Sequence, residues 1–327
     1  MSGAAAAAAP STSLAPNHPR DLWALTKPRI TLMVLITAAA GYFLAAGGRP
    51  GAQAMLTALL GIGLVAAGTS GMNQVWERDV DARMERTRRR PIPSGRVSAR
   101  AGWVFTGLLA SLGVGFLYVL VNPLTSALAA LSVLSYVFVY TPLKRVSSLS
   151  TLVGAIPGAL PIMGGWTAAR GELGPGAWAL FGILFFWQLP HFLALAWLFR
   201  ADYQRGGLKM LGVDDPDARQ TRVHSVLYAS ALLPASLFPV AIGLSGWAYL
   251  VVALVMGVAY GWAAIRFWAR ADVNSARGLF RVSLLYLPVL LLALSIDRGP
   301  YPGAPDGSPA DEAGQVTLSA AVSRLSS

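Results

Sequence analysis

The chain reads AQAMLTALLGIGLVAAGTSGM at residues 52–72 and NQVWERDVDARMERTRRRPIPSG at residues 73–95. The first run is apolar and about as long as a membrane-spanning helix needs to be. The second run gathers acidic and basic residues at one end of that span, and another apolar run follows at residues 101–121. Two apolar spans joined by a charged loop are typical of a helical membrane protein.

The composition supports this interpretation. Of the 327 residues, 55% are hydrophobic and 13% are charged. That charged share is about half of the ~25% found in soluble domains. The sequence therefore predicts an all-α membrane protein with nine transmembrane helices. They are expected near residues 29–47, 52–72, 101–121, 124–140, 149–168, 175–199, 223–243, 246–268 and 279–296.

The distribution of basic residues predicts the orientation. When the nine spans are threaded through a membrane, all but four of the 26 Lys and Arg residues fall on one side. The exceptions are Arg49, Arg170, Arg298 and Arg324. Basic residues collect on the cytoplasmic side of membrane proteins, so the N-terminus is predicted to be cytoplasmic. The same rule accounts for the net charge of +11 without nucleic-acid binding.

The chain divides into a membrane domain and two tails. Residues 1–21 are rich in Ala, Pro and Ser and are predicted to form a disordered cytoplasmic tail; residues 297–327 are predicted to form a disordered outer tail. Residues 22–296 form the membrane domain. Its two long cytoplasmic loops follow the second and sixth spans, which suggests two four-helix halves and a ninth helix. The absence of cysteine excludes a thiolate metal site.

The charged loop after the second span contains the strongest candidate site. Asn73, Glu77 and Asp81 are spaced by four residues, so their side chains share one face of an α-helix, whereas Asp79 points away. Carboxylate and amide oxygens suit Mg²⁺, which often shares its site with substrate phosphates. The alternative is an amphipathic helix whose charges pair with each other and face water.

Basic side chains near this loop are able to donate hydrogen bonds to phosphate oxygens. The candidates in the loop are Arg78, Arg83 and the run Arg86–Arg90. The helix is expected to continue through this run until Pro91 and Pro93 end it. Tyr140, Lys144 and Arg145 end the fourth span at the same membrane face and are further phosphate candidates, although such a group is also an ordinary membrane anchor.

The loop after the sixth span begins FRADYQRGGLKML, residues 199–211. Asp202, Arg205 and Lys209 share one face if the helix continues, but the pair Gly206-Gly207 is expected to loosen or end it. One carboxylate with two cations is an incomplete metal site. We therefore expect this segment to complete the site that the first loop begins; the alternative is a helix end whose charges face the membrane surface.

A histidine inside the sixth span is the third feature. His191 lies next to Gln188 and Pro190 in an otherwise apolar run. Polar groups inside a membrane span are costly and mark functional sites. A neutral imidazole is able to ligate iron. The alternative is a structural, hydrogen-bonded histidine.

These motifs together resemble a known family. The pattern NxxxExxxD followed by RPxPxG, with a second charged motif after the sixth span, resembles the UbiA superfamily of intramembrane prenyltransferases. Within that superfamily, LTKPRIT, YTPLKR and WQLPHFLALAWLFRADYQRGGLKML resemble the protohaem IX farnesyltransferase (haem O synthase) subgroup. The resemblance runs from about residue 22 to residue 296.

The resemblance implies nine helices around a central cavity. It implies transfer of a farnesyl group from farnesyl diphosphate to a vinyl group of haem b, with Mg²⁺ as cofactor. Asn73, Glu77, Asp81 and Asp202 are then expected to hold the metal and, with Lys209, to act in catalysis. The residues expected to contact the substrates are Arg78, Arg86, Arg90, Lys144, Arg145, His191, Tyr203 and Arg205.

The implied setting is the inner membrane of a bacterium, with lipid around the bundle and the active site on the cytoplasmic side. The product haem O would serve a haem A synthase or the assembly of a terminal oxidase. Two alternatives stay open: a related enzyme that prenylates a quinone precursor or another tetrapyrrole, and a non-catalytic lipid-binding or transport protein. A transporter would place polar residues at mid-membrane depth in several spans, whereas the charges here cluster at one face.

Overall fold

The computed structural model describes residues 18–213, 215 and 217–301. In this part of the chain, nine helices are long and apolar enough to cross a membrane. They are α2 (Pro28–Ala45), α3 (Ala52–Trp76), α5 (Ala99–Leu120), α6 with the helical turns that follow it (Pro123–Leu143), α8 (Ser150–Arg170), α9 (Pro175–Leu198), α11 (Arg219–Ala241), α12 (Trp247–Arg270) and α13 (Val273–Ile296). The prediction of an all-α membrane protein with nine spans is confirmed.

The two shortest predicted spans, the fourth and the ninth, are longer in the structure than hydropathy suggests. The fourth consists of α6 (Pro123–Val133), a π-helical segment η1 (Leu134–Tyr140) and the single turn α7 (Thr141–Leu143). The ninth, α13, begins at Val273 instead of residue 279, because the carboxylate of Asp272 accepts a hydrogen bond from the amide of Ser275 at 2.6 Å. Such caps set helix ends in polar sequence, where a hydropathy pattern cannot detect them.

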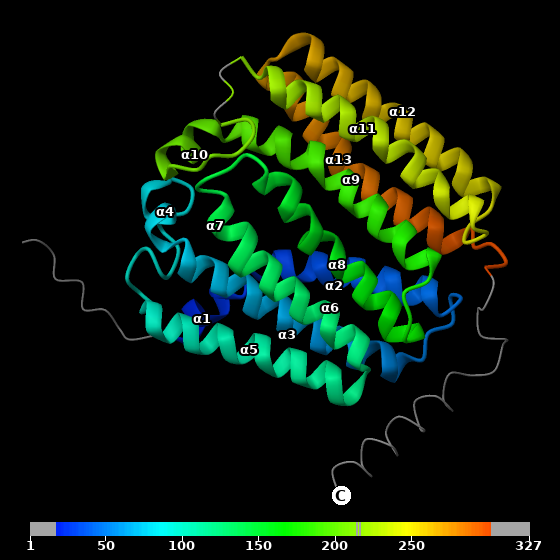
Figure 1. Ribbon diagram of the computed structural model, residues 1–327, viewed down its shortest axis with the longest axis horizontal. Coiled ribbons are helices and arrows are strands. Elements are labelled where there is room, and N and C mark those ends of the chain that lie inside the picture. Colours follow the sequence, from blue (N-terminus) through cyan, green and yellow to red (C-terminus); the bar gives the residue numbers. More distant parts are fainter. Residues whose placement is uncertain (1–17, 214, 216, 302–327) are drawn as a thin grey trace, which may run out of the picture.

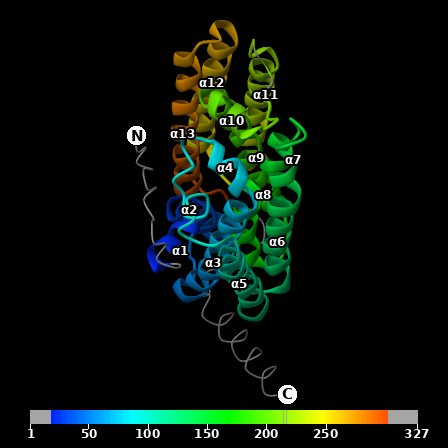
Figure 2. The same ribbon diagram turned by 90° about the vertical axis from the view of Figure 1, so that its left-hand side faces the viewer.

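The helices lie side by side in a flattened bundle, from α5 and α3 at one edge, through α2, α8 and α9, to α13, α11 and α12 at the other (Figure 1). The short helices α4 (Arg78–Arg83) and α10 (Arg200–Gly206) contact each other at one end of the bundle, as Figure 1 and Figure 2 show from two sides. The two charged loops therefore meet, as their assignment to one side of the membrane predicts.

Glycine allows the two halves of the bundle to approach closely. A Cβ atom at Gly41 of α2 would lie 2.2 Å from the carbonyl oxygen of Ile162 in α8. A Cβ atom at Gly165 of α8 would lie 1.9 Å from the carbonyl oxygen of Ala38 in α2. Any side chain at either position would separate these helices, which join the first half to the second.

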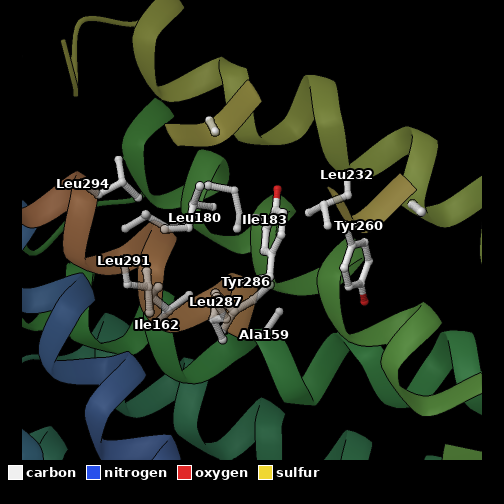
Figure 3. Packing of buried hydrophobic residues seen from close by; sticks show 14 of the residues in the cluster. Ala159, Ile162, Leu180, Ile183, Leu232, Tyr260, Tyr286, Leu287, Leu291 and Leu294 are labelled. Carbon is white, nitrogen blue, oxygen red and sulfur yellow. The ribbon is translucent and has the colours of Figure 1, made fainter. Parts of the chain in front are cut away.

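The core of the second half is filled by apolar side chains from α8, α9, α11, α12 and α13 (Figure 3). Ile183 on α9, Leu232 on α11, Tyr260 on α12 and Tyr286 on α13 are all fully buried. This packing fixes α9 against α13 and so fixes the position of the sixth-span histidine between them.

The described chain includes parts of both predicted tails. Helix α1 (Pro19–Leu25) begins within residues 1–21. At the other end, the hydroxyl of Tyr301 accepts a hydrogen bond from the amide of Gly176 at 3.0 Å, so residues 297–301 contact the bundle. Residues 1–17 and 302–327, to which the tail predictions mainly apply, lie outside the described residues.

Candidate active site

The Asn73, Glu77 and Asp81 side chains are placed by a short break between two helices. Helix α3 ends at Trp76, and Glu77 joins it to α4. The amide of Glu77 donates to the carbonyl of Asn73 at 3.0 Å, and the amide of Asp81 donates to that of Glu77 at 2.8 Å, so the four-residue spacing is kept across the break. All three side chains are buried, and the Asn73 amide donates to Glu77 Oε2 at 2.8 Å.

The expected helix through the arginine run is wrong. Helix α4 ends at Arg83, and the chain turns well before Pro91. The Thr87 hydroxyl donates to the carbonyl of Asp81 at 2.9 Å, and Arg90 donates to the carboxylate of the same residue at 2.7 Å. These contacts fold the arginine run back over the site, which a local helix signal does not reveal.

Three cations surround the three oxygen-bearing side chains. Lys144 forms a buried ion pair with Glu77, at 2.5 Å from Nζ to Oε1. Arg90 pairs with Asp81, as described above, and the Lys27 ammonium donates to Asn73 Oδ1 at 3.1 Å. Glu77 Oε1 accepts no hydrogen bond apart from its ion pair. In this structure, the carboxylate and amide oxygens of the cluster are therefore paired with cationic side chains.

Lys27 is a site residue that sequence reasoning missed. The motif LTKPRIT marks it only as a charge at the membrane edge. In the structure Lys27 has a φ of 46°, in the left-handed region, at the junction of α1 and α2, and Pro28 begins α2 directly after it. Strain of this kind is held where the surrounding structure requires it. The sequence signal that could have identified Lys27 as a site residue is its predicted position at the same membrane end as Asn73.

The charges of this cluster shift one another's pKa values. Burial raises the pKa of Glu77, but Lys144, Lys27 and the Asn73 hydrogen bond outweigh burial and leave it below its usual range. Burial, with the nearby Arg90 and Lys144, lowers the pKa of Lys27 to about 7. Burial also opposes the charge on Lys144, but Glu77 keeps the pKa of Lys144 above its usual value. The central pair is therefore ionised at neutral pH.

Asp202 occupies a different position from the one predicted. Its buried carboxylate accepts hydrogen bonds from the amides of Glu85 at 2.8 Å and Arg86 at 3.3 Å, and from the Arg205 guanidinium at 2.7 Å. Burial raises the pKa of Asp202, but these three donors outweigh burial and lower it. Asp202 therefore holds the first loop onto α10, and its hydrogen bonds go to Glu85, Arg86 and Arg205 instead of to the buried cluster.

Lys209 does not share a face with Asp202. As expected, the glycine pair ends α10: Gly207 follows the helix with a φ of 74°. The Lys209 side chain is exposed, and its amide donates to the carbonyl of Lys144 at 2.7 Å. Its contribution in this structure is to tie the second loop to the end of the fourth span.

The other predicted substrate contacts in the loops lie in three places. The Arg86 guanidinium lies 4.8 Å from the centroid of the Phe199 ring and donates to the Tyr203 hydroxyl at 3.3 Å, beside Asp202. Arg78 is exposed and pairs with the exposed Asp79 at 3.4 Å, away from the buried cluster. The spacing of these residues along a helix predicts this position for Asp79. Arg145, next to Lys144, keeps a buried Nε without a hydrogen bond.

His191 lies between α9 and α13. Its Nδ1 shares a hydrogen bond of 2.8 Å with the Ser283 hydroxyl. Its ring stacks on Trp187 and Phe280, with centroids 5.2 Å and 4.9 Å away. Among the described residues, Nε2 has no hydrogen-bond partner, and the hydrogen bond at Nδ1 is compatible with either a structural or a ligand-binding role.

A pocket of about 40 Å³ lies between α2, α3, α6 and α8. Its lining includes Val34, Ile62, Ser132 and Leu160. One water needs about 10–15 Å³ of such space, so this pocket has room for a few waters at most and is far too small for a farnesyl chain. The large central cavity that the resemblance implies stays a prediction.

The donor set fits magnesium better than a softer metal. Nowhere in the described residues do three or more His, Cys, Asp or Glu side chains gather as a metal site. The buried cluster combines two carboxylates with one amide instead, all of them oxygen donors. Mg²⁺ favours oxygen ligands and keeps several waters, so it needs few protein ligands.

Comparison with known proteins places the chain in a family. The UbiA prenyltransferase family matches residues 34–285. A protoheme IX farnesyltransferase of Solibacter usitatus is 43% identical over 291 residues, covering 85% of this chain and 99% of the relative. A protoheme IX farnesyltransferase of Koribacter versatilis is 43% identical over 289 residues, covering 85% of this chain and 93% of the relative.

Solved structures agree on the fold. A digeranylgeranylglyceryl phosphate synthase superposes with a TM-score of 0.72 at 14% identity, covering 85% of this chain and 98% of that one. A UbiA homolog from Archaeoglobus fulgidus bound to DMAPP and Mg²⁺ superposes with a TM-score of 0.64 at 16% identity, covering 84% of this chain and 99% of that one. With its sequence match over most of its length, the chain belongs to the UbiA prenyltransferase family.

Proposed function

We propose that this protein transfers a farnesyl group from farnesyl diphosphate to a vinyl group of haem b and so makes haem O. The observation that carries the proposal is the 43% identity to protoheme IX farnesyltransferases over nearly their full length. In the proposed reaction, the farnesyl C–O bond breaks, diphosphate leaves, and the electron pair of the vinyl double bond forms a C–C bond to the farnesyl carbon. Water then adds to the cation left on the vinyl carbon next to the porphyrin ring and loses a proton, which gives a hydroxyl group.

Magnesium is the proposed cofactor, held by Asn73, Glu77 and Asp81. The buried oxygens described above support this assignment, as does the Mg²⁺ bound to the Archaeoglobus fulgidus homolog. When bound, the metal would neutralise charge on the diphosphate as the allylic bond breaks. Asp202 acts from outside this set, by holding the loop that carries the arginines.

Cationic side chains of this chain are the proposed diphosphate ligands. Lys144 and Arg90 pair with the two carboxylates that the metal would take. If a metal took those carboxylates, Lys144, Arg90 and Lys27 would be free to bind the diphosphate oxygens. Fixed positive charge aimed at a leaving group lowers the barrier without any covalent nucleophile.

We infer that haem b is positioned through His191. The Ser283 hydroxyl fixes one ring nitrogen and leaves Nε2 for the iron, which is the usual arrangement of a metal-binding histidine. His191→Ala is expected to weaken haem binding, measured from the haem absorption spectrum, more than farnesyl diphosphate binding. Equal loss of both, or of neither, contradicts a haem contact.

The proposed location is a bacterial inner membrane with the buried cluster on the cytoplasmic side. The strong bias of basic residues toward that end of the bundle supports this orientation. A haem A synthase or the assembly of a terminal oxidase is the proposed user of the product.

The decisive experiment incubates purified protein with haem b, farnesyl diphosphate and Mg²⁺, with a chelator control and the Asp81→Asn variant. The expected result is a product with the mass of haem O, absent in both controls. Unchanged haem b together with prenylation of a quinone precursor or of another tetrapyrrole would establish the alternative enzyme. No transfer to any acceptor would support a non-catalytic lipid-binding or transport role.

A further inference from the structure

The fourth span changes its helical register just before the candidate site. The π-helical segment η1 ends at Tyr140, and the amide of Thr141 donates to the carbonyl of Tyr136, five residues earlier. Short π-helical segments inside α-helices are rare and frequently lie at functional sites. This one directs Thr141 at Asn73 and is followed, three residues after Thr141, by Lys144.

The hydroxyl of Thr141 has only one hydrogen to donate, and that hydrogen is already used. Thr141 is fully buried, and its Oγ1 donates to the carbonyl of Tyr136 at 2.8 Å. Toward Asn73, 3.1 Å away, Oγ1 therefore acts only as an acceptor. The Asn73 side chain presents its NH₂ group to Thr141, and its oxygen would find a donor there only if the hydroxyl gave up its bond to the Tyr136 carbonyl.

This constraint decides which way the Asn73 amide faces. The same NH₂ group donates to Glu77 Oε2 at 2.8 Å, and Oδ1 consequently points to the Lys27 ammonium, at 3.1 Å. If the amide turned over, its oxygen would face a carboxylate, and its NH₂ group would face a cation. Thr141, Glu77 and Lys27 together disfavour that orientation, and of these three only Thr141 is proposed neither as a metal ligand nor as a diphosphate contact.

We propose that Thr141 is a positioning residue that keeps Asn73 Oδ1 directed at the cation-binding space of the site. This inference rests on the proposed function, because it assigns Thr141 a role toward the metal that Asn73 would help to hold. The Thr141 hydroxyl does not reach the metal; it acts through the Asn73 amide. Hydrogen-bond partners of metal ligands typically contribute about 10–100-fold to metal affinity.

The test compares three variants of the full-length protein in detergent. Thr141→Val keeps the shape of the side chain but removes the acceptor, while the amide of residue 141 still satisfies the Tyr136 carbonyl. Thr141→Ser restores the hydroxyl. The matched control is Thr106→Val, because Thr106 is also fully buried and its hydroxyl donates at 2.7 Å to the carbonyl of Gly102, four residues earlier and outside the site residues.

Binding of Mn²⁺ in the presence of inorganic pyrophosphate is measured from the electron paramagnetic resonance signal of free Mn²⁺. We expect Thr141→Val to weaken Mn²⁺ binding about tenfold or more, and Thr141→Ser and Thr106→Val to bind like the wild type. The melting temperature of each variant is recorded alongside, and Thr141→Ala replaces Thr141→Val if the latter does not fold.

The outcomes separate this inference from the proposed function. If the wild type binds Mn²⁺ and Thr141→Val binds it with the same affinity, the positioning role of Thr141 is overturned, while the proposed metal site is retained. Equal loss in Thr141→Val and Thr106→Val also overturns it, because the effect is then one of packing. If the wild type binds no Mn²⁺ with pyrophosphate, the proposed metal site fails and the role of Thr141 fails with it.

Discussion

The two charged loops are similar in sequence, but their buried carboxylates have different partners in the structure. In the loop after α3, Glu77 and Asp81 are buried among cations and point at the body of the bundle. In the loop after α9, Asp202 is equally buried, but two of its three hydrogen-bond donors are backbone amides of the first loop. Similar charged motifs therefore form the proposed ligand set in one half and, in the other half, hold the loop that carries it.

The largest effect is expected where a proposed ligand loses its charge. Glu77→Gln and Asp81→Asn are each expected to lower turnover about 10²–10³-fold or more, because an electrostatic group that acts on the leaving diphosphate is lost. Farnesylation of haem b by purified protein is the measurement, with the melting temperature as a check on folding. Near-wild-type turnover in either variant would remove the metal-site assignment.

The next effect is on stability. Lys144→Met leaves the Glu77 carboxylate buried without its partner, and breaking a buried ion pair in this way costs about 3–5 kcal/mol. The matched control is Arg78→Met, whose side chain is 52% exposed and pairs with the exposed Asp79, so that about 0–1 kcal/mol is expected. Thermal unfolding in detergent compares the two.

The double variant Lys144→Met/Glu77→Gln sharpens that result. It removes the buried charge, so it is expected to regain much of the lost stability while staying inactive. Stability as low as that of Lys144→Met alone would show that packing of the lysine chain, and not its charge, was lost.

A smaller effect is expected from Asp202, which holds the first loop onto α10. Asp202→Ala leaves the amides of Glu85 and Arg86 without their acceptor, and an unsatisfied buried group costs about 1–3 kcal/mol. Hydrogen exchange at those two amides is expected to accelerate by the corresponding factor of about 5–150. Turnover should fall less than in Asp81→Asn, through a higher KM for farnesyl diphosphate. Loss of Mn²⁺ binding equal to that in Asp81→Asn would make Asp202 a metal ligand after all.

The smallest effect belongs to the opposite face of the first loop. Asp79 is exposed and pairs only with Arg78. Asp79→Asn is expected to change turnover and stability by no more than about 0.5 kcal/mol, or roughly twofold, as for other surface substitutions. A loss comparable to that of Asp81→Asn would mean that both faces of α4 contribute to the site.

Some of these features follow from local sequence. The apolar runs predict nine spans because a helix must be about 20 residues long and apolar to cross a bilayer. The four-residue spacing predicts that Asn73, Glu77 and Asp81 share a face, because 3.6 residues make one turn. The Gly206-Gly207 pair predicts the end of α10, because glycine readily takes the positive φ found at Gly207.

Two other features were predicted wrongly from local sequence. The arginine run contains no residue that ends a helix before Pro91, yet the helix ends at Arg83, where contacts to Asp81 from further along the chain replace the helical bonds. Asp202 and Lys209 have the spacing of a shared face, but the intervening glycine pair turns the chain between them.

The sequence by itself thus determined the spans, the orientation bias and the row of oxygen-bearing side chains, because each depends on the composition or period of one continuous segment. Only the tertiary structure decided the partners of that row. Lys27 comes from the start of α2, Thr141 and Lys144 from the end of the fourth span, and Asp202 from α10. Their meeting depends on how separate helices pack and on one π-helical change of register, and neither leaves a periodic signal in the residues concerned.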